Sequence, residues 1–411
     1  MNSSATRRAL VDARSRVVVA LALAAGVAFW THTFEPSLRS VTHGFPVYYV
    51  SARLIVEGRW TPAVYDDAWF SAEVKALSGG RVGEVYSAHP PVASLLLLPL
   101  AGLDMANARV AWLVLNLALL LLALIAILST TGRMRSPVFV AGLLGFALTY
   151  APVRENFRLA QAYVFLLFLY ALAFVGGVRR QSATTGLALG TAAATKVSGG
   201  PLWLLPAVRG RWRDALAGGL FAALFVIASL VLTGVEGWTG YFSVLPDHLL
   251  GKVMPPALAF QTTSSFFQHL FAADARWSLQ PVWHQPWLAV VLTIGVSVAA
   301  LGLTLWRSRR SEFDLAFAAA ATLSVVLQPL AEEYHYTLLL LPLAVMASRV
   351  FREPIVRIEV AWLLLVVSLL AIAWPYKLDG LTGSWAVLMG YPRLYGGWLL
   401  WAWLYVRMKA R

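Results

Sequence analysis

The chain of 411 residues contains no cysteine, few charged residues and only seven histidines. The absence of cysteine excludes a disulfide framework, a thiol nucleophile and a cysteine-ligated metal or iron–sulfur site. Charged residues make up only 13% of the chain, whereas 59% of it is hydrophobic, and apolar runs of transmembrane length recur along it. This composition predicts an all-α polytopic membrane protein.

Acidic residues are also scarce, with 20 carboxylates against 33 lysines and arginines, so the formal net charge is +13. The arginines gather in short breaks between the apolar runs, and the positive-inside rule assigns such breaks to the cytoplasm. The histidines and 14 of the 20 carboxylates then fall on the outer side. The basic charge therefore indicates membrane topology and contact with anionic membrane lipids, and no nucleic-acid partner is expected.

Placing the arginine-rich breaks in the cytoplasm predicts a single integral membrane domain over residues 1–411. Both termini then lie in the cytoplasm, and we expect the first apolar run to be retained as a signal anchor. A large first extracytoplasmic loop covers 34–107, central spans cover 108–234, a second extracytoplasmic loop covers 235–286, and C-terminal spans cover 287–411. About twelve transmembrane helices fit the pattern, at 17–33, 108–131, 137–151, 160–178, 183–195, 199–208, 214–234, 287–306, 313–330, 336–349, 358–374 and 392–408.

Within the first loop, residues 90–103 are apolar but too short to span comfortably. Counting these residues as a span would place arginine-rich breaks on the outer side, so we expect a helix that lies along or dips into the outer leaflet. A loop that returns to the membrane in this way can roof a cavity suited to a lipid-linked substrate. Polar residues at the outer helix ends would line the cavity floor: Gln161, Lys196, Glu332, Glu333 and His335.

Ionisable groups at membrane depth are energetically costly, so their default interpretation is functional. The alternative is that Glu332 and Glu333 are simply solvated in a loop and that Lys196 snorkels to the interface. Lys196, Arg154 and Arg158 are placed to bind a phosphate group.

Several short motifs follow one another in an order typical of one enzyme family. They are Gly44-Phe-Pro-Val-Tyr48-Tyr49 up to Gly58, Val64-Tyr65-Asp66, His89-Pro90-Pro91 before a leucine run, Ala160-Gln161, Thr195-Lys196-Val197, Gln261-Thr-Thr-Ser264, and Gln328-Pro-Leu-Ala-Glu-Glu-Tyr-His335. With these motifs the chain resembles glycosyltransferase family 87, the DUF2029 group, which includes polyprenyl-phosphate-mannose-dependent mannosyltransferases.

The resemblance implies a GT-C-like bundle that transfers a hexose such as mannose, or a pentose, from a polyprenyl-phosphate donor to a lipid or glycan acceptor hydroxyl. It implies the inner (plasma) membrane, with the active site on the extracytoplasmic face. The substrate-binding residues suggested by the matching motifs are Tyr48, Tyr49, His89, Gln161, Lys196 and Ser264.

One departure concerns the catalytic base. The family's first-loop aspartate, taken as the base, aligns with Gly44, which has no side chain to accept a proton. A base must be a carboxylate or an imidazole within hydrogen-bond reach of the acceptor hydroxyl. Asp66 or Asp67 is the favoured replacement, with Glu333 and His335 as further candidates, and His335 contacting phosphate or assisting proton transfer. The alternative for the aspartate pair is an N-cap or turn role.

Other classes of site find less support. No His-x-x-x-His pair indicates a metal, although acidic residues near His335 could ligate a divalent ion, so no cofactor is expected. The glycines near 186–190 lack the strand-turn-helix setting of a phosphate loop. The alternative functions are a transporter or flippase of lipid-linked sugars, which usually shows internal repeats that this chain lacks, or a catalytically degenerate GT-C binding subunit.

Overall fold

A computed structural model describes residues 3–86, 89–197, 199–249, 257–274, 280–352, 355–372 and 384–408. Within these ranges the chain is helical throughout, with no β-strand. Parts of the second predicted loop, at 250–256 and 275–279, and the end of the predicted span 358–374 lie outside the described residues.

The N-terminal part contains two long helices, α1 and α5, with a group of short ones between them. Their bounds are α1 (Ser3–Phe29), η1 (Trp30–Phe34), α2 (Glu35–Arg39), α3 (Phe45–Val56), η2 (Pro62–Tyr65), α4 (Asp67–Ser78), η3 (Pro91–Leu95), η4 (Leu98–Leu100) and α5 (Met105–Thr130). The central part contains α6 (Pro137–Thr149), α7 (Ala151–Leu159), α8 (Tyr163–Arg179), α9 (Ser182–Lys196), α10 (Gly200–Val208) and α11 (Trp212–Leu249). The C-terminal part contains α12 (Thr263–Phe271), α13 (Pro286–Ser308), α14 (Phe313–Val326), η5 (Glu333–Leu339), α15 (Leu340–Val350), α16 (Arg357–Ala371), η7 (Ser384–Gly390) and α17 (Pro392–Arg407).

The helix starts follow from local sequence. Asp66, Asp104 and Ser136 each accept a backbone N–H of the first turn, which satisfies a donor that the helix itself cannot pair. Proline stands in the first turn of several helices, including α6 and α13, where its missing N–H leaves no bond unmade.

Among the described residues, four helical segments are long and apolar enough to cross a membrane: Ser15–Arg39, Met105–Thr130, Trp212–Asp247 and Pro286–Ser308. A fifth results if α6 and α7, which meet at a bend of 53°, count as one broken span. The other predicted spans fall on shorter helices, such as the 15 residues of α9 and the 9 of α10, whereas a span needs about 20 residues. The polytopic helical fold is therefore plausible, but the prediction of twelve spans is not confirmed.

Two predicted boundaries differ in the structure for identifiable reasons. The first span continues past residue 33, because the π-helical turn η1 joins α1 to α2 without a break. The predicted interfacial helix at 90–103 corresponds to a shorter apolar segment, Pro91–Leu100, made of the 3₁₀ helices η3 and η4, and the residues of η3 are mostly buried within the protein. By contrast, α11 breaks at Gly234, whose backbone is not helical, where the predicted span ends.

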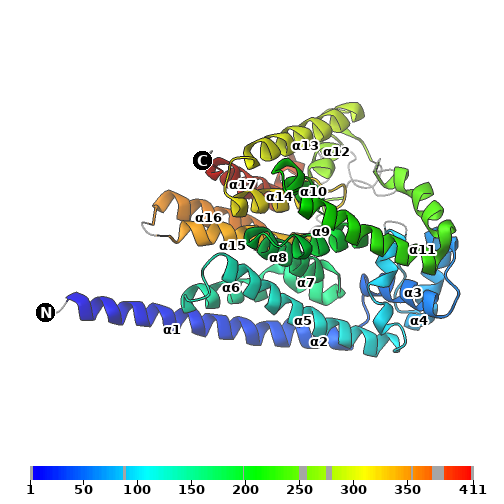
Figure 1. The fold of residues 1–411 in the computed structure, drawn as a ribbon, viewed down its shortest axis with the longest axis horizontal. Helices are drawn as coiled ribbons and strands as arrows, with labels where there is room; N and C mark the ends of the chain where they lie inside the picture. Colours follow the sequence, from blue (N-terminus) through cyan, green and yellow to red (C-terminus); the bar gives the residue numbers. More distant parts are fainter. Residues whose placement is uncertain are drawn as a thin grey trace.

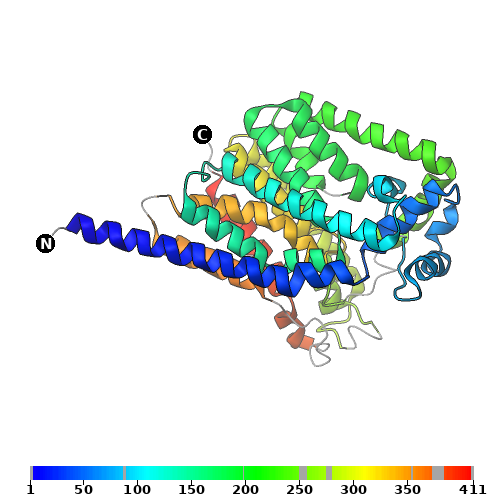
Figure 2. The ribbon, with the colours of Figure 1, turned by 90° about the horizontal axis from the view of Figure 1, so that it is seen from below.

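The helices form a bundle with two chemically different ends. In Figure 1, α1 begins and α17 ends towards the left side, while α3 and α4 lie at the right end, and Figure 2 shows the same separation from below. The arginine-rich turns contact one another: Arg133 donates to the Ser348 carbonyl, Arg209 to the Ser311 carbonyl and Arg307 to the Met408 carbonyl. The breaks that the sequence assigned to one side thus lie together in space.

Candidate active site

A cavity of about 300 Å³ lies at the end of the bundle where the first-loop segment meets the ends of α8 and α9 and the start of η5. Segments far apart in sequence supply its polar lining: Glu84, His89, Gln161, Lys196, Glu332 and His335. Four of the five polar residues expected on the cavity floor are therefore in one place, and only Glu333 is not among its lining.

Lys196 ends α9, and its ammonium group is held by a histidine from the first loop. Lys196 Nζ lies 2.9 Å from His89 Nε2, and His89 Nδ1 lies 3.3 Å from the Tyr86 carbonyl oxygen. The imidazole ring of His89 therefore donates a hydrogen bond through Nδ1 and accepts one from the Lys196 ammonium group at Nε2. Burial lowers the pKa of Lys196 from 10.5 to about 7, although the charges of Glu332 and Glu84 act in the opposite direction.

Two tyrosine rings complete the surroundings of this ammonium group. Lys196 Nζ lies 5.0 Å from the centroid of the Tyr48 ring and 5.3 Å from that of Tyr163, where the π faces stabilise a cation. The Tyr48 hydroxyl donates to Gln161 Oε1 at 3.1 Å, which fixes both side chains beside the cavity.

His335 is buried and has a defined tautomer. Its Nδ1 accepts the Glu332 backbone N–H at 3.1 Å, so in the neutral ring Nε2 carries the proton. The ring packs between those of Tyr163 and Tyr334, with centroid distances of 4.1 and 4.7 Å. Burial, together with the nearby charge of Lys196, lowers the pKa of His335 well below its usual value. His335 therefore presents a neutral hydrogen-bond donor.

Two carboxylates line the cavity. Glu84 Oε1 accepts the Gly44 backbone N–H at 2.5 Å and lies 3.2 Å from His43 Nδ1. Glu332 Oε1 accepts the Tyr334 hydroxyl at 3.1 Å. Burial raises the pKa of both carboxyl groups, so each is a stronger base than an exposed glutamate.

Gly44 has no space for a side chain. Its φ of +97° is unfavourable for other residues, and a Cβ there would lie 2.7 Å from Gln161 Nε2 and 2.9 Å from the Leu159 carbonyl oxygen. Gly44 is also the N-cap of α3, so Glu84 accepts a backbone N–H at the start of that helix, where a negative charge is favoured. The carboxylate of Glu84 thus lies next to Gly44, the position at which the resemblance led us to expect an aspartate.

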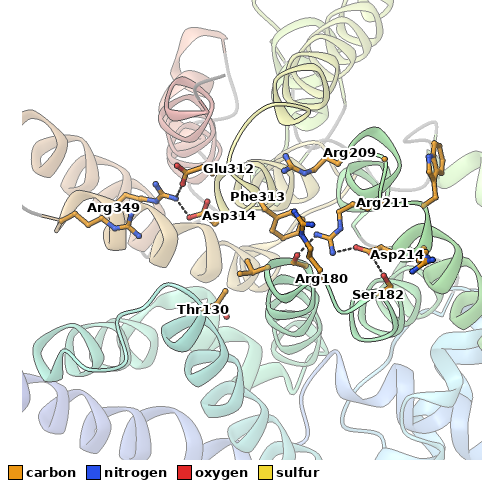
Figure 3. Close-up of a pocket in the computed structure, with 16 residues that line it drawn as sticks. Thr130, Arg180, Ser182, Arg209, Arg211, Asp214, Glu312, Phe313, Asp314 and Arg349 are labelled. Carbon is orange, nitrogen blue, oxygen red and sulfur yellow. Dashed lines mark hydrogen bonds and ion pairs between the residues drawn. The ribbon is translucent and has the colours of Figure 1, made fainter. Parts of the chain in front are cut away.

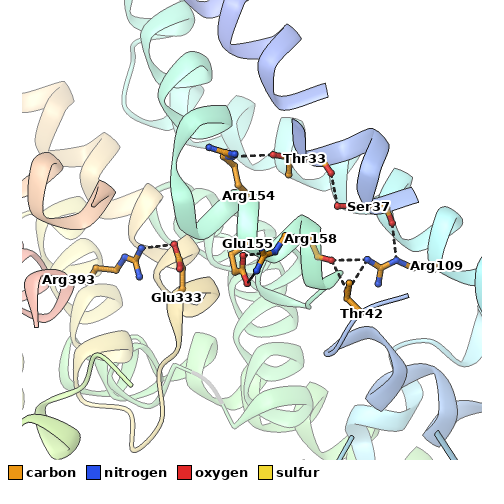
Figure 4. Close-up of polar contacts among 9 residues, drawn as sticks. All are labelled: Thr33, Ser37, Thr42, Arg109, Arg154, Glu155, Arg158, Glu333 and Arg393. Carbon is orange, nitrogen blue, oxygen red and sulfur yellow. Dashed lines mark hydrogen bonds and ion pairs between the residues drawn. The ribbon is translucent and has the colours of Figure 1, made fainter. Parts of the chain in front are cut away.

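The predicted catalytic aspartates lie outside the cavity lining. Asp66 is the N-cap of α4, where its Oδ1 accepts the Trp69 N–H at 2.9 Å, and Asp67 is exposed in the first turn. The capping alternative therefore accounts for the contacts of Asp66. Glu333 instead forms an ion pair with the buried Arg393, with 2.5 Å between Oε1 and Nη2 (Figure 4).

The remaining predicted binding residues also have partners elsewhere. Arg154 and Arg158 both lie on α7. Arg154 donates to Thr33 Oγ1 at 3.1 Å, and Arg158 forms an ion pair with Glu155 of the same helix at 3.0 Å (Figure 4). The Tyr49 hydroxyl donates to the Leu103 carbonyl at 2.7 Å, and Ser264 accepts from Gln268 on α12 at 3.2 Å. None of these four predicted residues is among the lining of the cavity.

Sequence reasoning missed Glu84, Tyr163 and Tyr334. Glu84 stands five residues before His89, and this proximity to a family-like motif is the signal that would have drawn attention to it. Within the described part of the chain, no group of three or more histidine, aspartate and glutamate side chains is arranged to hold a metal ion.

Comparison with known proteins gives one match. The model of glycosyltransferase family 87 matches residues 88–329, a stretch that contains His89, Gln161 and Lys196 of the cavity. No curated protein and no solved structure matches the chain.

Proposed function

Because the chain belongs to glycosyltransferase family 87, we propose that it transfers a sugar from a polyprenyl-phosphate donor to a hydroxyl of a lipid or glycan acceptor. The sugar is a hexose such as mannose, or a pentose, and the reaction takes place on the extracytoplasmic face of the plasma membrane. The observation that carries the proposal is the convergence of Lys196, His335 and two carboxylates on one cavity.

The leaving phosphate requires hydrogen-bond donors and positive charge. Lys196 supplies the charge, and a phosphate beside it would raise its lowered pKa, so that the lysine is cationic in the complex. Neutral His335 has its Nε2–H available as a second donor that needs no protonation step. Such donors act more strongly in a site from which water is excluded.

The acceptor hydroxyl requires a base, and Glu84 is our choice for that role. Its carboxylate receives a backbone N–H at the start of α3, it borders the cavity, and its raised pKa gives it the basicity that a general base needs. Glu332 is engaged by the Tyr334 hydroxyl and lies within the electrostatic reach of Lys196, which favours a role on the phosphate side. Gln161 and Tyr48 then position the sugar.

The test is transfer by the purified full chain in proteoliposomes, with a radiolabelled polyprenyl-phosphate mannose or polyprenyl-phosphate pentose and a glycan acceptor. The wild type should label the acceptor, and Lys196→Met should lower kcat/KM by roughly 10- to 10²-fold, the loss expected for one charge-assisted hydrogen bond. Lys75→Met is the matched control, because Lys75 is exposed on α4 and does not line the cavity.

Two outcomes would contradict the proposal. Movement of intact donor across the bilayer without any transfer of label would support the transporter alternative. Equal losses in the Lys196 and Lys75 variants would show that the cavity is not the site of the reaction.

A further inference from the structure

A second and larger cavity, of about 870 Å³, lies at the arginine-rich end of the bundle. The helices α8 and α9 connect the two cavities, because Tyr163 and Lys196 at their outer ends line the first, whereas Gly177 and Ser182 at their other ends line the second. The 17 residues of α8 separate the cavities by about 25 Å. The proposed sugar transfer therefore leaves this second cavity without a role.

The second cavity has an excess of positive charge. Six arginines and three carboxylates line it: Arg180, Arg209, Arg211, Arg213, Arg349 and Arg352 with Asp214, Glu312 and Asp314. The carboxylates are already engaged within the protein (Figure 3). Arg211 pairs with Asp214 at 2.6 Å, and Arg349 pairs with both Glu312 and Asp314. Four arginines therefore remain without a carboxylate among the pairs that the described residues form.

Three of these arginines are available to an anion. In the part of the chain that the structure describes, Arg209 donates to the carbonyl oxygens of Ser308 and Ser311 and forms no ion pair with a carboxylate. Arg180 and Arg213 have no side-chain ion pair within the described ranges. Arg180 also has a left-handed backbone with φ of +56°, at the end of α8 where glycine is the usual residue. A charged side chain occupies a position at which glycine would be less strained.

The rim of the cavity is apolar on one side. Val178 and Trp212 line it and are 43% and 62% exposed, and tryptophan at such a position is typical of a membrane interface.

We propose that this cavity binds the phosphate group of an anionic membrane lipid. The phosphodiester would lie between Arg180, Arg209 and Arg213, and the acyl chains would lie against Val178 and Trp212. Arginine suits this role, because its planar donors match phosphate oxygens in pairs, and basic pockets between transmembrane helices recognise lipid headgroups in this way.

The test measures lipid retained by the purified full chain in neutral detergent, by native mass spectrometry, with added phosphatidylglycerol, phosphatidylcholine or inorganic phosphate. The wild type should retain phosphatidylglycerol in preference to phosphatidylcholine. The double variant Arg180→Gly/Arg213→Gln should bind phosphatidylglycerol on the order of tenfold more weakly or worse. Arg309→Gln/Arg310→Gln is the matched control, since it removes two exposed charges near the same end without touching the cavity lining, and it should bind nearly as the wild type does.

The choice of glycine at position 180 separates binding from folding, because glycine adopts the observed backbone without strain and should leave the thermal midpoint unchanged or higher. Equal weakening in both double variants would overturn the proposal in favour of diffuse attraction to the basic surface. Equal retention of both lipids would also overturn it, and so would displacement of phosphatidylglycerol by millimolar inorganic phosphate, which would indicate a site for free anions.

Discussion

Replacement of Glu84 by glutamine is the most direct test of how the chemistry is organised. Glutamine keeps the Oε1 atom that accepts the Gly44 N–H, so α3 should start in the same place and the donor should still bind. The amide cannot take a proton from the acceptor hydroxyl. Loss of a general base typically lowers turnover by about 10²- to 10⁴-fold, and we expect Glu84→Gln to fall within that range.

The pH profile gives a second readout. Burial raises the pKa of Glu84 above its ordinary value, so kcat/KM of the wild type should rise with pH through that raised value as the carboxylate ionises. On the alkaline side it should fall as Lys196, whose pKa is about 7 in the free enzyme, loses the charge that holds the phosphate. Glu84→Gln should lose the acidic limb and keep the alkaline one.

Glu73→Gln is the control for this experiment. The side chains of Glu84 and Glu73 are 16% and 17% exposed, and both belong to the first loop, but Glu73 pairs with Arg59 away from the cavity. The assay is initial-rate transfer of radiolabelled sugar between pH 4 and 9 in proteoliposomes. A Glu84→Gln enzyme with a near wild-type rate and an unchanged acidic limb would refute the assignment and move the base to Glu332.

Two further predictions concern stability. Gly44→Asp introduces an aspartate at the position where the resemblance led us to expect one, but we expect no gain in activity. The variant should be less stable by at least about 1–3 kcal/mol, because a Cβ at position 44 has no space and the backbone φ there is positive. A rise in transfer activity in this variant would contradict the packing argument. Arg393→Met should lower stability by about 3–5 kcal/mol, because it leaves Glu333 largely buried without its partner. The double variant Arg393→Met/Glu333→Gln should recover much of this loss in thermal unfolding, whereas no recovery would show that Arg393 stabilises the fold in another way.

The sequence alone predicted the all-helical fold and five of the polar residues that line the cavity: His89, Gln161, Lys196, Glu332 and His335. Lys196, Gln161 and His335 stand out because polar groups at the ends of apolar helices are costly unless they are used. The number of spans was not predictable in the same way, since an apolar helix of 9 to 16 residues buried inside the protein has the same pattern as a short span. α15 is an example, because most of its 11 residues are buried and it contacts α5 and α8, which are remote in sequence, as well as its neighbours along the chain.

The carboxylate that we propose as the base illustrates a different limit. An aspartate that caps a helix and an aspartate that accepts a proton look alike in sequence, and Asp66 is a cap in the structure. Glu84 lies 40 residues from Gly44, and only the folded chain brings its carboxylate to the start of α3. Long-range contacts of this kind leave no local signature.

The break in α11 determines the depth of the candidate active site. From Trp212 to the non-helical Gly234 the helix extends about 34 Å, close to the roughly 30 Å of bilayer hydrocarbon. Tyr241, which lines the candidate active-site cavity, lies at most about 10 Å further along the chain, and in the proposed topology this places it in the headgroup layer. The phosphate of a lipid-linked sugar already resides at that depth, so its tail need not leave the bilayer for the sugar to be transferred. If the proposed function is correct, the thickness of the bilayer sets how closely the phosphate of the donor and the ammonium group of Lys196 match in depth.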